Sequence, residues 1–156
     1  MRDDRRDLYQ SVILDHARSP RNFRRLEGGS LSAYGHNPMC GDQLTVFLRL
    51  DESGFIAEAA FEGHGCAIAL ASGSLMTEVL RGRTPRQAER LLAAFEAMCG
   101  SDSFDEAAFP DEDRAALQHL QVLSGVRAFP VRIRCATLAW HTMSAALHGV
   151  KEASSG

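Results

Sequence analysis

Residues 40–66, CGDQLTVFLRLDESGFIAEAAFEGHGC, hold the pattern that decides the fold of this chain. Leu44, Val46, Leu48 and Leu50 alternate with other side chains, and this period of two is typical of a strand with one apolar face. Residues 51–54, Asp-Glu-Ser-Gly, reverse the chain, and a second apolar run extends from Ile56 to Phe61 before Gly63. The stretch therefore predicts an antiparallel hairpin.

Helical patterns and helix-ending residues occupy most of the chain outside this hairpin. Thr84, Pro85 and Gln87 form a capping box with proline at the first helical position. Residues 35–38 are predicted to form a turn, 102–113 an acidic loop followed by a helix to Leu123, and 151–156 a frayed tail. The other predicted helices span about residues 4–18, 66–80, 84–100 and 131–147. Helices outnumber strands, so the fold class is α+β, with residues 1–156 as a single domain.

Charge and composition narrow the classes of function. The net charge is −3 and the pI about 6.1, which argues against a general nucleic-acid-binding protein. The charged first six residues do not resemble a signal peptide, and no apolar run is long enough to span a membrane. We therefore expect a cytoplasmic protein whose four cysteines are reduced thiols rather than disulfides.

Three of the four cysteines lie at turns or element ends, where thiolates are favoured. Residues i and i+2 of an extended segment face the same side, so Cys40 and Asp42 can point at one metal ion, and Gly41 lets the backbone bend there. Cys66 begins a helix, whose free N–H groups lower a thiol pKa. Cys135 lies in the first turns of the last helix.

Neighbouring residues give these cysteines further support. Gly65 precedes Cys66 in a flexible turn, and His64 is a candidate for proton transfer or for supporting a metal ligand. Arg134 is next to Cys135 and would add positive charge. Cys99 follows Met98 at the end of an amphipathic helix, so we expect it in the core.

Three thiolates and one carboxylate form a suitable tetrahedral set for zinc, or for iron in a cluster. The chain has no C-x-x-C motif, so spacing alone leaves open whether these cysteines form a metal site or are unrelated.

Three strings in order resemble the iron–sulfur cluster assembly family of IscU and NifU N-terminal domains: residues 37–42 (NPMCGD), 61–69 (FEGHGCAIA) and 134–140 (RCATLAW). The resemblance covers about residues 7–148 and leaves the tail, 149–156, outside. Arg134 stands where the IscU branch has a histidine, and an extra segment lies within about residues 81–127. Both features resemble the SufU branch.

The resemblance implies a stand-alone SufE/NifU-like domain: a small antiparallel sheet with helices on one face and the metal site at one exposed end. It implies Cys40, Asp42, Cys66 and Cys135 as ligands, zinc as the metal, and a SufS-type cysteine desulfurase as the partner. Downstream Suf scaffolds or apo-proteins are further partners that it suggests.

Three hypotheses follow for the function. The first is a zinc-dependent sulfurtransferase role in iron–sulfur cluster biogenesis, in which Cys40 is the predicted catalytic acceptor because it lies in a glycine-flexed loop; Cys135 is the second choice. The second is a scaffold that assembles a transient 2Fe–2S cluster on the same residues. The third is a zinc-stabilised interaction module without sulfur chemistry.

Overall fold

The computed structural model describes residues 2–28, 30–101 and 104–154. The elements, in chain order, are α1 (Arg2–Arg18), β1 (Leu31–Asn37), β2 (Asp42–Leu50), β3 (Ile56–His64), α2 (Ala67–Leu80), α3 (Pro85–Gly100), η1 (Glu106–Ala108), α4 (Asp111–Leu120), η2 (Gln121–Ala128), α5 (Pro130–Leu147) and β4 (Glu152–Ser154). The predicted α+β class is confirmed.

The sheet has the strand order β3-β2-β1-β4. The predicted hairpin is confirmed as β2 and β3, which pair antiparallel through the turn at residues 51–54. In that turn the Asp51 carboxylate accepts the backbone N–H groups of Ser53 and Phe55, and Gly54 takes the left-handed φ of 88° that favours glycine.

Two strands were missed by the sequence prediction. β1 runs antiparallel to β2 as far as Asn37, so the predicted turn at residues 35–38 is displaced to 38–41. The prediction of a frayed tail at residues 151–156 is also wrong for residues 152–154. They form β4, which pairs in parallel with β1, with Glu152 opposite Tyr34. The sheet is therefore mixed rather than wholly antiparallel. Residues 155–156 of the tail lie outside the described residues.

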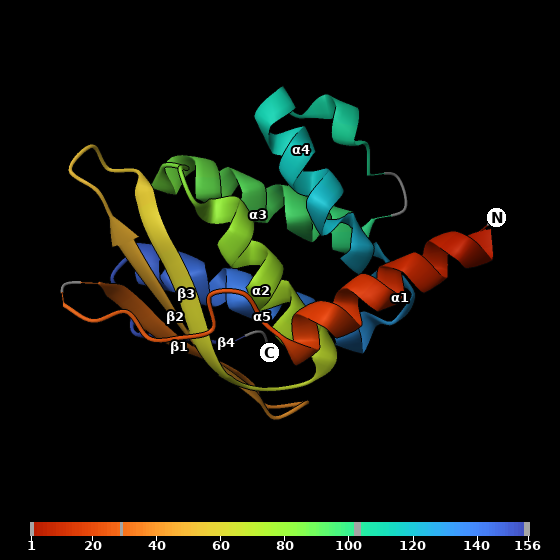
Figure 1. The fold of residues 1–156 in the computed structure, drawn as a ribbon, viewed down its shortest axis with the longest axis horizontal. Helices are drawn as coiled ribbons and strands as arrows, with labels where there is room; N and C mark the ends of the chain where they lie inside the picture. Colours follow the sequence, from red (N-terminus) through yellow and green to blue (C-terminus); the bar gives the residue numbers. More distant parts are fainter. Residues whose placement is uncertain (1, 29, 102–103, 155–156) are drawn as a thin grey trace.

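The helices lie on one side of the sheet, with α2 and α5 directly against it (Figure 1). The alternating Leu44, Val46 and Leu48 of β2 are completely buried on this face, and Trp140 of α5 and Phe61 of β3 are the largest side chains in the same core. The predicted layering of helices on one sheet face is confirmed.

The opposite face of the sheet carries the chain segment that follows α1. Phe23 forms a parallel bridge to Phe61 of β3, and Leu26 packs in a small buried cluster with Phe47 and Ala60. This segment accepts the Phe61 N–H at the Asn22 carbonyl and then crosses β3 toward β2, so it connects α1 to the sheet (Figure 1).

The segment within residues 81–127 forms a helical subassembly that packs on α5, α1 and α2. The predicted capping box is present, with Thr84 Oγ1 accepting the Gln87 N–H and Gln87 Oε1 accepting the Thr84 N–H. α4 begins at Asp111, so the end of the predicted acidic loop is helical, while residues 102–103 of that loop lie outside the described residues. The helix predicted to reach Leu123 is α-helical only as far as Leu120, and the chain continues from Gln121 as the 3-10 helix η2.

Asp113 of α4 holds this subassembly together through two ion pairs. Its side chain is fully buried and accepts hydrogen bonds from Arg83 at 2.9 Å and from Arg90 at 2.6 Å. A buried charge is tolerated only when it is paired and hydrogen-bonded, and here both conditions hold.

Among the described residues, no helix is long and apolar enough to cross a membrane.

Candidate metal centre

Cys40 and Asp42 are placed by the tight turn between β1 and β2. The Asn37 carbonyl accepts the N–H groups of Cys40 at 3.2 Å and of Gly41 at 2.8 Å, and Gly41 has a φ of 75°. The predicted use of Gly41 for backbone bending is therefore visible in the turn. Asp42 opens β2 on its buried face and is only 1% exposed, whereas Cys40 is half-buried at the surface.

Cys66 is the residue before α2 and acts as its N-cap. Its backbone N–H donates to Asp42 Oδ1 at 2.9 Å, while its Sγ accepts the Ala69 N–H at 3.4 Å and lies 3.9 Å from Asp42 Oδ2. Gly65 allows this approach, because a Cβ there would lie 2.8 Å from Asp42 Oδ1. The turn between the end of β3 and the start of α2 is thus packed against the Asp42 carboxylate.

Cys135 approaches the same carboxylate from α5. Its thiol is completely buried, lies 3.4 Å from Cys40 Sγ and receives a weak hydrogen bond from Asn37 Nδ2 at 3.7 Å. The ligand atoms of Cys40, Asp42 and Cys135 all lie within 4.8 Å of one another. Cys66 adjoins this group through Asp42, but its thiol is turned toward its own helix cap.

The electrostatics of the thiol cluster favour a bound cation. Burial raises the pKa of the Cys135 thiol, and the hydrogen bond that this thiol donates to Cys40 and the nearby charge of Cys66 raise it further. Several thiolates this close repel one another, and a divalent metal relieves both the repulsion and the cost of burial. Three sulfurs and a carboxylate are donors that Zn²⁺ accepts in tetrahedral sites, so these residues fit that metal.

Arg132, rather than Arg134, is the cation that faces the thiols. Its Nη1 lies 3.9 Å from Cys135 Sγ, and this contact, together with the charges of Cys66 and Cys135, raises the pKa of the Arg132 guanidinium. Arg134 is exposed and lines a separate shallow depression with Met39. The sequence contained the signal: residues three apart share a helix face, whereas adjacent residues do not.

His64 is exposed at the end of β3, opposite Gln43 of β2. Side chains alternate between the faces of a strand, so His64 and Gln43 lie on the side of the sheet away from Asp42. The supporting role of His64 stays a prediction, and this position separates His64 from Asp42 by the sheet. Cys99, in contrast, is fully buried in the core as predicted, and burial raises its pKa to about 12.

A groove of about 1250 Å³ opens beside Cys40. One wall comes from α1 through Tyr9 and Ile13, and the other from η2 and the start of α5, including Phe129 and Val131. Phe129 and Val131 are large apolar side chains that remain 64% and 55% exposed. The half-buried thiol of Cys40 is thus bordered by an apolar surface of the size that binds another molecule.

Comparison with known proteins identifies the class to which this fold and this cluster belong. The profile of the family described as the NifU-like N terminal domain matches residues 8–113, and the chain belongs to that family. This places it among the iron–sulfur cluster assembly scaffold and SufU proteins, as the sequence resemblance implied.

Individual relatives match over nearly the whole chain. The Bacillus subtilis protein named zinc-dependent sulfurtransferase SufU is 35% identical over 136 residues, which cover 87% of this chain and 86% of that protein. The Thermotoga maritima iron–sulfur cluster assembly scaffold protein IscU is 34% identical, covering 90% and 92%. A crystal structure of a putative SUF-system scaffold, SufU of Fervidobacterium islandicum, superposes with a TM-score of 0.73 at 29% identity, covering 87% and 93%.

Proposed function

We propose that this protein is a zinc-dependent sulfur acceptor that works with a cysteine desulfurase in the biogenesis of iron–sulfur clusters. The observation that carries the proposal is the meeting of Cys40, Asp42 and Cys135 within 4.8 Å at the mouth of an apolar groove. The similarity to a Bacillus subtilis protein named as a zinc-dependent sulfurtransferase supports it.

Cys40, Asp42, Cys66 and Cys135 would hold the zinc ion. Cys66 joins the other three because its thiol lies 3.9 Å from Asp42 Oδ2. When bound, zinc supplies the positive charge that keeps the thiols deprotonated at neutral pH. Asp42 is the hardest of the four donors and the easiest to exchange, so it controls how readily a thiol is released for reaction.

Cys40 is the acceptor in this proposal, because it is half-buried next to the groove while Cys135 is completely enclosed. Its thiolate attacks the outer sulfur of the partner's cysteine persulfide. A new S–S bond forms on Cys40, the S–S bond of the donor breaks, and the donor cysteine leaves as a thiolate. Arg132, placed 3.9 Å from Cys135 Sγ, offsets the negative charge that collects at the cluster.

The direct test is to incubate the protein with a cysteine desulfurase and cysteine and to map added sulfur by mass spectrometry under non-reducing conditions. We expect the persulfide on Cys40, and we expect Cys40→Ser to accept none. Cys99→Ala is the matched control and should behave as wild type, because Cys99 is buried away from the cluster. A fully competent Cys40→Ser variant would move the acceptor role to another thiol.

The second candidate function is a scaffold for a 2Fe–2S cluster on the same residues, from which a cluster passes to downstream scaffolds or apo-proteins. The 34% identity to a Thermotoga maritima protein named as an IscU scaffold favours it. Zinc is colourless and an iron–sulfur cluster absorbs visible light, so the spectrum of anaerobically purified protein separates the two functions. A third role, as an interaction module without sulfur chemistry, predicts that the protein leaves the desulfurase's turnover of cysteine unchanged.

A further inference from the structure

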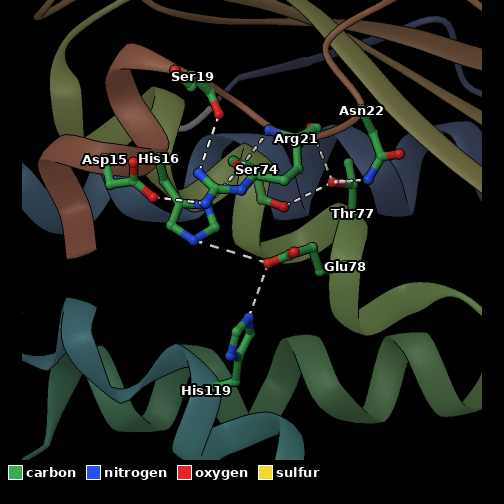
Figure 2. A network of polar contacts seen from close by, with 9 residues as sticks. All are labelled: Asp15, His16, Ser19, Arg21, Asn22, Ser74, Thr77, Glu78 and His119. Carbon is green, nitrogen blue, oxygen red and sulfur yellow. Dashed lines mark hydrogen bonds and ion pairs between the residues drawn. The ribbon is translucent and has the colours of Figure 1, made fainter.

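Three helices bring two histidines and a glutamate together away from the thiol cluster. His16 of α1 and His119 of α4 both direct Nε2 at the same oxygen of Glu78 on α2, as Figure 2 shows. The Nε2 to Oε1 distance is 3.9 Å for His16 and 3.0 Å for His119. The two rings meet edge to face, with their centroids 6.4 Å apart.

His16 is held in this direction by its other ring nitrogen. Its Nδ1 shares a 2.7 Å hydrogen bond with Ser74 Oγ, which also accepts the backbone N–H of Arg21 at 2.8 Å. His16 is 5% exposed and Ser74 is completely buried, so the ring cannot easily turn away. Metal-binding histidines are typically fixed in this way, through a hydrogen bond on the nitrogen that does not bind the metal.

Arg21 lies near these side chains, but its positive charge is paired with a carboxylate other than Glu78. The Arg21 guanidinium pairs with the Asp15 carboxylate at 2.6 Å, while its backbone contacts Ser74 (Figure 2). Glu78 is therefore left as the anion that both histidines face. A carboxylate between two imidazoles is the donor set His₂Glu, which suits zinc and similar divalent transition metals.

We propose that His16, Glu78 and His119 form a second binding site for a divalent transition metal such as Zn²⁺. The side chains of Glu78 and His119 are 35% and 46% exposed, so both have room to adjust, and water can supply a fourth ligand. His16, buried and hydrogen-bonded, is the fixed member around which the other two close. The site is separate from the thiol cluster and does not depend on the proposed sulfur chemistry.

The position of this site relates it to the groove beside Cys40. α4 ends at Leu120, the residue after His119, and continues directly into η2. η2 forms part of one groove wall and α1, which carries His16, forms the other. A metal ion at this site would therefore join the two walls and limit how far they separate.

Cobalt(II) is the probe for the test, because its spectrum distinguishes sulfur ligands from nitrogen and oxygen ligands. The full chain is freed of metal with a chelator under reducing conditions and titrated with Co²⁺. We expect two equivalents in wild type: one with thiolate-to-metal charge-transfer absorption, and one with ligand-field absorption only. His119→Gln should lose the second equivalent and keep the first.

His141→Gln is the matched control. His141 pairs with Glu96 at 3.0 Å and is 36% exposed, so it resembles His119, but among the residues that the structure describes no second histidine pairs with Glu96. This variant should keep both equivalents. Glu78→Gln should behave as His119→Gln does.

A single equivalent in wild type that shows thiolate-to-metal charge-transfer absorption would overturn the proposal, because the histidines and Glu78 would then form a metal-free hydrogen-bonded contact. Retention of the second equivalent in His119→Gln would overturn it as well. Absence of the charge-transfer absorption would count against the thiol site and the proposed function. An equivalent with ligand-field absorption only that is lost in His119→Gln would still support this site.

Discussion

Gly65→Ala is expected to weaken metal binding without removing any proposed ligand. The backbone of Gly65 does not have a left-handed φ, so alanine meets no conformational penalty there. Its new Cβ would instead lie 2.8 Å from Asp42 Oδ1 and 3.2 Å from Asp42 Cβ and Cγ. The perturbation therefore acts first on the Asp42 side chain.

The size of the effect follows from how firmly Asp42 is held. A Cβ contact below 3.0 Å is essentially never found, so the carboxylate must move. It is 1% exposed and accepts the Cys66 N–H at 2.9 Å, so it has no open space to move into. Overpacking of this kind costs about 1–3 kcal/mol of stability. Displacing groups that orient a metal ligand costs about 10–100-fold in metal affinity, or about 1.4–2.8 kcal/mol.

The assay is a zinc competition titration against a chromogenic chelator, with urea unfolding of the zinc-free protein measured in parallel. Gly100→Ala is the matched control, since a Cβ at that position has open space around it. Its zinc affinity should equal that of wild type. If Gly65→Ala binds zinc within about twofold of wild type, the role of Asp42 as a ligand is refuted.

Three further predictions concern burial and ligand exchange. Asp113→Asn should lower the free energy of unfolding by about 3 kcal/mol. The Asp111 side chain is 90% exposed, so Asp111→Asn should change this free energy by less than about 0.5 kcal/mol. Equal losses of the two variants in urea titrations would contradict this prediction. Burial alone would raise the pKa of Asp113, but two arginines hold it below its ordinary 3.8, so its contribution to stability is present above pH 3.8 and lost as the pH falls below that value. Native protein at neutral pH should be alkylated at Cys40 while Cys99, whose pKa is raised to about 12, stays unmodified; equal labelling by mass spectrometry would show that Cys99 is accessible. Asp42→Ala should accept sulfur poorly and exchange metal at an altered rate, and wild-type behaviour in both assays would refute its control of ligand release.

The sequence by itself determined the elements whose signals are local. The alternation in residues 44–50 requires only that one strand face be buried, and the capping box at Thr84 is complete within four residues. The four ligands that we propose were also predicted from sequence, through turn chemistry and family strings. Cys99 was assigned correctly to the core because its helix has an apolar face.

Only the tertiary structure decided which distant groups meet. β1 and β4 have weak strand signals of their own. β1 becomes a strand by pairing with β2, and β4 by pairing with β1. The helical period already places Arg132 on the same face as Cys135, and the packing of α5 decided that this face meets Cys40. The convergence of His16 and His119 on Glu78 required three helices to pack, and no local pattern encodes such packing. Local free energies select helices and strands, whereas contacts between distant residues depend on how those elements bury their apolar faces together.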